Sequence, residues 1–233
     1  MSGGLSVISI PGLEHEPFAE VWFHEVDGTS FAEASTRARS IGKPGLEVWT
    51  TTRAPGVVAF LARRGFEEVR RYVISELDVA SAPDPGPPRF TLTSLAVQPE
   101  LADELYELAL VAYPDQPGRA GTRIGRDWYQ WGLRAHPPES YFVALEEDRV
   151  LGYGYLELDG GQWRNGFMAV AREARGRGVA GAIKRAQIGW AKERGIETLR
   201  TANEARLDSM LALNLRLGYR PLYEEIVLRG PCA

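Results

Sequence analysis

The sequence predicts an α/β fold built on a mixed, α+β-type sheet, and three observations support that prediction. A glycine-rich loop, RGRGVAG at residues 175–181, leads directly into an amphipathic helix. Segments with strand and helix periodicity alternate along residues 90–222. A proline-rich stretch at 81–89 separates this part from a first part that repeats some of its pattern. Together these features indicate helices that pack on a central sheet.

From residue 90 onward, the expected elements follow in the order β-α-β-β-β-α-β-α-β. Pro99 opens the first helix, because proline is favoured in the first helical turn. Gly195 and Gly218 end the second and third helices as glycines that accept a left-handed conformation. The expected strands cover residues 90–95, 141–145, 150–158, 163–170, 196–203 and 219 onward, and the expected helices cover 99–112, 178–194 and 207–217.

The loop at 175–181 fits two kinds of phosphate site. Read as GxGxxG from Gly176, it matches the dinucleotide fingerprint; read as RxxGxA from Arg175, it matches a loop that holds the diphosphate of an acyl-coenzyme A. In both, small residues let the backbone approach the ligand, and the next helix directs free N–H groups at it. A dinucleotide site needs an acidic residue at the end of the following strand, but Glu197 begins that strand. The coenzyme A interpretation is therefore favoured.

The segments around the loop make this interpretation specific. Val170, the loop, the strand that ends at Asn203, and the helix with Met210 and Asn214 that closes in LGY at 217–219 occur in this order. They resemble the GNAT superfamily of N-acetyltransferases, firmly over 163–222 and more weakly over 89–162. The resemblance implies a GNAT acyl-CoA N-acyltransferase fold with acetyl-CoA as the acetyl donor. One departure is that only about ten residues after Tyr219 can form strand, where the family commonly has a hairpin.

The resemblance also implies where acetyl-CoA binds. Two parallel strands, 163–170 and 196–203, would separate and admit the pantetheine arm as an added strand. A backbone N–H at Val170 would stabilise the oxyanion, amides of 177–181 would hold the diphosphate, and Asn203 would bind the pantetheine amides. The residues expected at this site are Met168, Ala169, Val170, Arg175, Gly176, Arg177, Gly178, Val179, Ala180, Gly181, Asn203 and Asn214.

Catalysis needs a group that takes a proton from the amine and, in many members of the family, a tyrosine that protonates the leaving thiolate. This chain has Asn214 at the position of that tyrosine, so no general acid is assigned. Glu157 is the candidate base, because the strand it ends lies beside the cofactor strand; an exposed strand-end carboxylate is the alternative interpretation. His136 and Tyr155 are further options for the base.

Aromatic residues gather in the segment 113–140, which lines the acceptor side in this family. Tyr113 and Trp128, together with Tyr155, are the candidate acceptor-side residues. Trp128 and Trp131 share a helical face, so core packing is the alternative for at least one of them. An aromatic wall here would suit a small amphipathic amine.

Composition and charge argue against several other classes. A formal net charge of -4 disfavours nucleic-acid binding, whereas residues 164–185 hold six basic side chains and one acid, which suits an anionic ligand. The single cysteine, Cys232, cannot form an internal disulfide and argues against a structural zinc site, so no metal is expected. Neither a membrane-span segment nor a signal pattern occurs, so we expect no membrane partner and a cytoplasmic protein.

We expect a first part at residues 1–80, a linker at 81–89 and a catalytic domain at 90–233. Residues 45–51 (GLEVWTT) align with 195–201 (GIETLRT), and 61–66 (LARRGF) align with 214–219 (NLRLGY). A chance match is the alternative to a duplicated domain. Residues 27–31 stand where the first copy would need its phosphate loop but lack the RxxGxA pattern. Residues 1–80 are therefore interpreted as a degenerate, partial GNAT-like half without a cofactor site.

The leading hypothesis is an N-acetyltransferase that moves an acetyl group from acetyl-CoA to a primary amine of a small molecule or peptide, by direct transfer in a ternary complex. A non-catalytic acyl-CoA-binding or sensing protein is the alternative, because Asn214 replaces the acid and no clear base is present. A narrower alternative is a tandem enzyme similar to mycothiol synthase, which the duplication suggests and the short first half opposes. The acceptor and the oligomeric state stay open.

Overall fold

The backbone divides into two compact units. Unit 1 comprises residues 1–74 and 222–233, and unit 2 comprises residues 75–221. The computed structural model describes residues 6–9, 16–84, 86, 89–116 and 124–233, apart from the side chains of Trp128 and Trp131. The division falls after residues 74 and 221, inside strands and not at the proline-rich segment 81–89, and residues 225–231 pair with residues 45–51 of the first unit.

The described residues of unit 1 form a sheet with two helices packed on it. Helix α1 (Gly28–Ser40) joins two parallel strands, and α2 (Pro55–Ala62) follows the second of them. Phe31 of α1 and Leu61 of α2 share a core with Val21 and Val48 of the strands. The strands, in spatial order, are β1 (Val7–Ser9), β2 (Phe18–Trp22), β3 (Gly45–Thr51), β10 (Arg220–Pro231) and β4 (Glu67–Asp78), of which β4 and β10 also have residues in unit 2.

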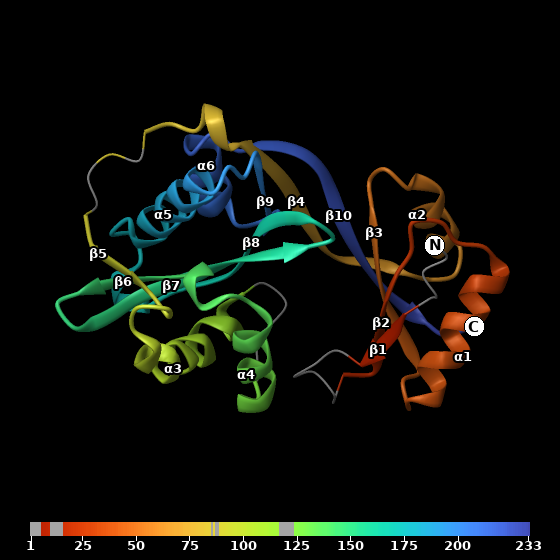
Figure 1. Cartoon of the computed structure of the whole chain (residues 1–233). Coiled ribbons are helices and arrows are strands. Elements are labelled where there is room, and N and C mark those ends of the chain that lie inside the picture. The colour runs from red at the N-terminus through yellow and green to blue at the C-terminus, as the bar shows by residue number, and fades with distance from the viewer. Residues whose placement is uncertain (1–5, 10–15, 85, 87–88, 117–123) are drawn as a thin grey trace. The chain divides into compact units, whose positions relative to one another are not determined.

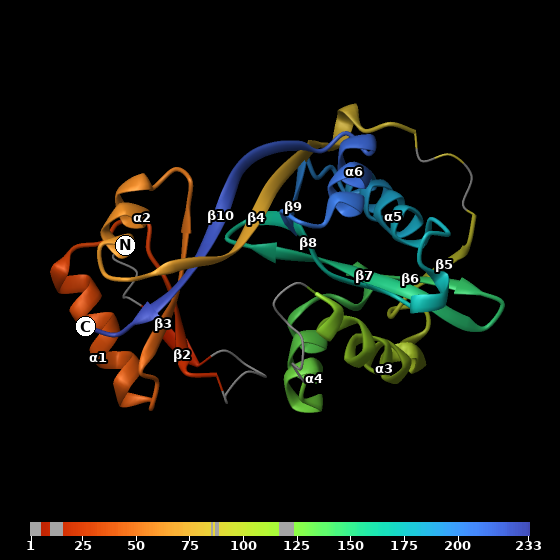
Figure 2. The ribbon, with the colours of Figure 1, turned by 180° about the vertical axis from the view of Figure 1, so that it is seen from behind.

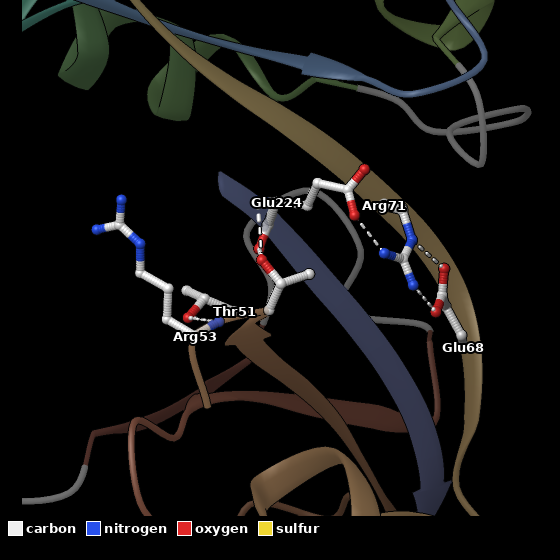
Figure 3. Close-up of polar contacts among 6 residues, drawn as sticks. Thr51, Arg53, Glu68, Arg71 and Glu224 are labelled. Carbon is white, nitrogen blue, oxygen red and sulfur yellow. Dashed lines mark hydrogen bonds and ion pairs between the residues drawn. The ribbon is translucent and has the colours of Figure 1, made fainter. Parts of the chain in front are cut away.

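The C-terminal strand completes the sheet of unit 1. Residues 225–231 of β10 run antiparallel to residues 45–51 of β3. Arg71 on β4 adds side-chain links: its guanidinium donates to both carboxylate oxygens of Glu68, at 2.7 and 2.8 Å, and to Glu224 of β10 (Figure 3). After Tyr219, where the family commonly has a hairpin, the chain therefore forms one long strand, β10, which pairs with the first half of the chain.

The described residues of unit 2 form a mixed sheet with helices on both faces, and the last residues of β4 lie at its β9 edge. The spatial order of its strands is β9-β8-β7-β6-β5, and all neighbours are antiparallel except β8 and β9. Helices α3 and α4 cover one face and α5 and α6 cover the other (Figures 1 and 2). The strands are β5 (Thr91–Ser94), β6 (Tyr141–Glu146), β7 (Arg149–Asp159), β8 (Gln162–Val170) and β9 (Thr198–Glu204). The helices are α3 (Ala102–Ala112), α4 (Arg126–Ala135), α5 (Val179–Glu193) and α6 (Asp208–Arg216). Single-turn helices are η1 (Val79–Ser81), η2 (Pro99–Leu101), η3 (Tyr113–Asp115), η4 (Pro138–Ser140) and η5 (Arg172–Ala174).

Each face of this sheet has its own core. Ile183 and Ile188 of α5 pack with Leu156 and Leu199 on one side. Leu105 of α3 packs with inward residues of β6, β7 and β8 on the other. The predicted order of elements from residue 90 onward is confirmed, and α4 is added within the segment that the sequence left without an element.

The aligned repeats adopt the same local structure in both units. After α2, Gly65 has φ +79°, and after α6, Gly218 has φ +94°, a left-handed backbone that favours glycine. The N–H of the next residue reaches back to the helix in each case, from Phe66 to Leu61 at 3.2 Å and from Tyr219 to Asn214 at 3.0 Å. These are matching Schellman-type ends, with the aromatic ring buried behind each glycine.

The helix that precedes the first repeat begins differently from α5. The carboxylate of Asp27 accepts the N–H of Ser30 at 2.7 Å, and the Ser30 hydroxyl accepts the N–H of Asp27 at 3.0 Å. This capping box satisfies N–H groups that a phosphate would otherwise bind. Residues 27–31 thus form a helix cap.

Candidate active site

Strands β8 and β9 separate along their length. In the described part of the chain they pair at only two positions, Arg164 with Arg200 and Asn165 with Thr201. Both strands continue beyond these pairs, to Val170 and Glu204. Their facing edges therefore offer unpaired backbone groups to an extended ligand, as the added-strand mode of binding requires.

The backbone direction of β8 shows which groups face this opening. The N–H of Ala171 donates to the carbonyl of Leu151 on β7 at 2.9 Å. Because successive residues of a strand direct their N–H groups to opposite edges, those of Met168 and Val170 point toward β9. The N–H of Ala169 points toward β7, and its side chain is 1% exposed in the core beside α3. Two of the three predicted backbone contacts thus face the opening.

A bulge lies where the strands begin to part. The β7–β8 register shifts between the pairs Leu156–Asn165 and Gly154–Met168, so that β8 has one extra residue there. A Cβ on Gly166 would lie 2.1 Å from Cε2 of the Tyr155 ring, so only glycine fits. An unpaired residue at a bulge leaves its backbone groups free of the ladder. The predicted candidate Tyr155 therefore packs directly against the strand that would carry the thioester.

The glycine loop places the uncapped N-terminus of α5 beside the same opening between β8 and β9. Gly176 and Gly178 have φ values of +75° and +92°, and α5 begins at the next residue without a side-chain cap. The N–H groups of the first helical turn have no partner within the helix. The Arg177 N–H, in contrast, donates to the Ala174 carbonyl at 3.4 Å. The open amides are thus Gly178 to Gly181, a group that an anion satisfies.

A groove of about 590 Å³ runs past this loop. Its walls come from β8, the loop and α6, and from the end of α3 and η3. Eight predicted residues line it: Met168, Val170, Arg175, Gly176, Gly178, Val179, Ala180 and Gly181. The groove has further lining residues that the sequence did not assign to the site, namely Arg89, Ala112, Asp115, Gln116, Ala174, Leu207, Ser209, Leu213 and Arg216. Met210 was noted only as part of the motif, and Arg185 only as one of the basic side chains at 164–185.

The arginines near the groove fall into two groups. Arg172 and Arg175 share the carboxylate of Asp115, and Arg177 pairs with Glu146. Three others, Arg89, Arg185 and Arg216, line the groove and have no carboxylate partner among the described residues. A side chain at Gly181 would meet the Arg185 guanidinium at 3.3 Å, which places this charge beside the open amides.

Asn203 and Asn214 bind each other behind the opening. The Asn214 amide donates to Oδ1 of Asn203 at 2.5 Å, and the Thr201 hydroxyl donates to the same oxygen at 3.3 Å. Asn214 is 2% exposed, and its own Oδ1 has no hydrogen-bond partner among the described residues. Neither asparagine lines the groove. Asn214 therefore orients Asn203, which lies beyond Thr201, the last residue of β9 that pairs with β8.

Lys184, which the sequence groups with the arginines, lies on the inner side of α5. It is 2% exposed, and its Nζ donates to Oδ1 of Asn165 at 3.1 Å and to Oγ1 of Thr201 at 3.3 Å, with the Tyr219 ring at 5.0 Å. Burial lowers the pKa of Lys184 to about 7. These contacts join the last paired residues of β8 and β9. Lys184 is thus a buried support beneath the opening and not a phosphate ligand.

The candidate base Glu157 lies opposite Arg164 in the β7–β8 ladder. Its two carboxylate oxygens lie 3.5 Å from Nε of Arg164 and 3.6 Å from Nε2 of His136. Burial raises the pKa of Glu157, although Arg164 and His136 oppose the shift. The His136 ring stacks on Tyr155 at 4.8 Å between centroids. The predicted candidates Glu157, His136 and Tyr155 therefore form one cluster that reaches the bulge.

The other acceptor-side candidates, Tyr113 and Trp128, lie on either side of residues 117–123, which are outside the described residues. Tyr113 in η3 packs its ring 5.7 Å from the ring of Phe167, in the bulge of β8. Trp128 belongs to α4, and its side chain lies outside the described residues. Burial raises the pKa of Tyr155 well above its usual range, so its hydroxyl stays protonated.

Two further features concern the described residues as a whole. No described helix is both long and apolar enough to cross a membrane. No group of three or more His, Cys, Asp or Glu residues gathers as a metal site there.

Comparison with known proteins identifies relatives of this chain. The family model "Acetyltransferase (GNAT) family" matches residues 102–219. A mycothiol acetyltransferase of Clavibacter michiganensis subsp. michiganensis is 25% identical over 203 residues, which cover 82% of this chain and 64% of that protein. The Clavibacter sepedonicus protein of the same name matches equally well. The chain thus spans just under two thirds of the curated relatives that it matches.

Solved structures share the fold. A GCN5-related N-acetyltransferase from Sphaerobacter thermophilus gives a TM-score of 0.74 at 17% identity, over 98% of this chain and 76% of that one. A tandem GNAT protein from the clavulanic acid biosynthesis pathway gives a TM-score of 0.73 at 20% identity, over 100% of this chain and 81% of that one.

Proposed function

The chain belongs to the acetyltransferase (GNAT) family, and on that premise we propose that it is an N-acetyltransferase that uses acetyl-CoA and a primary amine of a small molecule or peptide. The predicted family and fold are confirmed by the family match and the structural relatives. The observation that carries the proposal is the opening between β8 and β9, which leads onto the uncapped start of α5. This arrangement suits a ligand with an extended amide arm and a diphosphate.

In the proposed mechanism, acetyl-CoA supplies the acetyl group as a thioester. The N–H groups of Met168 and Val170 point to the open edge and would hold its carbonyl oxygen as negative charge develops there. The amine nitrogen forms a bond to the acetyl carbon, the C–S bond breaks, and the sulfur leaves as thiolate. Glu157 takes the proton that the amine loses, and its raised pKa makes it a stronger base than an exposed carboxylate.

We propose that unit 1 holds no cofactor. The side chains of Asp27 and Ser30 accept hydrogen bonds from backbone N–H groups at the start of α1, and no RxxGxA pattern precedes that helix. A calorimetric titration should therefore give one equivalent of acetyl-CoA per chain. Two equivalents would contradict this assignment.

The test of function is release of free thiol from acetyl-CoA in the presence of a panel of primary amines. Glu157→Gln should lower kcat by about a hundredfold or more, as loss of a general base does. Asp159→Asn is the matched control, because Asp159 pairs with the same Arg164 at 2.9 Å and is 67% exposed. In the wild type, activity should fall as the pH drops through the raised pKa of Glu157, and this acid limb should vanish in Glu157→Gln.

Two alternatives are decided by the same assay. A non-catalytic acyl-CoA-binding protein remains an alternative because Asn214 offers no acid; binding of acetyl-CoA without turnover of any amine would establish it. The match to a mycothiol acetyltransferase covers 82% of this chain, and it favours a similar activity as the second alternative. The acceptor of that enzyme therefore belongs in the amine panel.

A further inference from the structure

The carboxylate of Asp115 binds two arginines beside the groove, Arg172 and Arg175. Asp115, the last residue of η3, accepts from NH2 of Arg172 at 2.7 Å with one oxygen, and from NH2 of Arg175 at 2.7 Å and Nε of Arg172 at 3.1 Å with the other. Arg175 opens the RxxGxA loop, and its Nε also donates to the Val170 carbonyl at 3.2 Å. Asp115 and Arg175 line the same groove. The carboxylate of Asp115 thus already binds Arg175, the arginine of the loop that a phosphate group in this groove would contact first.

The charge on this carboxylate is permanent near neutral pH. Hydrogen bonds from Arg172 and Arg175 lower the pKa of Asp115 to about 2. The Asp115 side chain is 28% exposed, so water reaches it but does not fully screen it. A diphosphate entering the groove would meet this negative charge and would find Arg175 already paired.

The position of Asp115 differs from that of the other carboxylate near the loop. Glu146 pairs with Arg177, but neither residue lines the groove. Arg185 lines the groove and has no carboxylate partner among the described residues. In the groove, Arg185 thus lies beside the open amides and is available to a ligand, whereas Asp115 holds Arg175.

We propose that Asp115 competes with the phosphates of coenzyme A for Arg175, so that it lowers the affinity for acetyl-CoA and must release Arg175 when the cofactor binds. This inference rests on the proposed use of acetyl-CoA. The opposite role, in which Asp115 holds Arg175 in position for the phosphate, predicts the opposite sign when the carboxylate is removed.

The experiment is calorimetric titration of the full chain with coenzyme A at low salt. Asp115→Asn should tighten binding about fivefold, because it removes a short-range repulsion across a partly exposed site and frees Arg175. Glu146→Gln removes a matched ion-paired carboxylate outside the groove and should change the Kd by less than about twofold. In an Arg175→Gln background, Asp115→Asn should have at most a small effect.

Each other outcome overturns the inference. Weaker or unchanged binding by Asp115→Asn would show that the carboxylate positions Arg175 or is irrelevant to it. An equal gain in the Arg175→Gln background would mean that Asp115 acts through general charge and not through Arg175. A wild-type chain that binds no coenzyme A would overturn the proposed function as well, whereas wild-type binding without a gain in the variant overturns this inference alone. Unfolding midpoints of all variants confirm that each is folded.

Discussion

Lys184 should make the stability of the chain depend on pH in a way that one substitution removes. In the folded chain burial lowers its pKa from 10.5 to about 7, whereas the unfolded chain keeps the ordinary value. Between these values the unfolded state binds one more proton than the folded state, so stability rises with pH across this window. The stabilisation is fully present above the unfolded pKa and is lost as the pH falls through the folded pKa near 7.

The magnitude follows from the same shift. From pH 7 to pH 9 the wild type should gain about 2 kcal/mol of unfolding free energy from this group alone. Lys184→Met removes the group without leaving a buried partner unsatisfied. Oδ1 of Asn165 still accepts from the Tyr219 hydroxyl at 2.8 Å, and the Thr201 hydroxyl still donates to Asn203. The variant should therefore be at least as stable as the wild type at pH 7.

The assay is urea unfolding at pH 7, 8 and 9 for the wild type and Lys184→Met. The difference between the two chains isolates Lys184, because all other titrating groups are common to both. Lys192→Met, an exposed lysine near the end of the same helix, is the control and should leave the pH dependence unchanged. Parallel stability curves for the wild type and Lys184→Met would refute the reasoning, since Lys184 would then carry its proton in the folded chain.

Three further outcomes are expected. Gly178→Ala should weaken acetyl-CoA binding about tenfold, because a φ of +92° costs an L-residue about 1–2 kcal/mol and the loop would shift to relieve it. Gly160→Ala, in a hairpin turn with φ +56°, is the control. Unchanged affinity in folded Gly178→Ala would contradict the loop assignment. Asn214→Ala should raise the KM for acetyl-CoA severalfold and leave kcat nearly unchanged, because it frees Asn203; a collapse of kcat would place its side chain in the chemistry. Glu47→Gln should destabilise unit 1 by about 3–5 kcal/mol in denaturant unfolding, because Glu47 is fully buried between two arginines; a loss below about 1 kcal/mol would contradict that role.

The loop and its helix could be predicted from the sequence because their physics is local. Gly176 and Gly178 adopt the left-handed backbone that their lack of a Cβ permits, and α5 begins at the residue after them. The same holds for Gly65 and Gly218, which end helices in both repeats. The order of strands and helices followed from periodicity for the same reason.

The candidate base and its neighbours were only partly predictable. The sequence offers Glu157 as the base, because the strand that it ends lies beside the cofactor strand, and His136 and Tyr155 as further options for the same role. Their contact depends on the β7–β8 register and on the segment that returns from α4, which spacing along the chain does not specify. That these options form one cluster was decided by the tertiary structure.

What the sequence by itself determined is therefore the family, the fold of residues 90–219 and the glycine loop that opens α5, since short-range backbone chemistry and periodicity define them. What only the tertiary structure decided depends on pairs far apart in the chain. Asp115 meets Arg175 across 60 residues, and β10 joins β3 of the first half. Lys184 lies beside the predicted apolar stripe of α5, and it became a buried support because β8 and β9 both pack against that side of the helix. Such contacts arise when separate elements come together in the fold, and no local pattern encodes them.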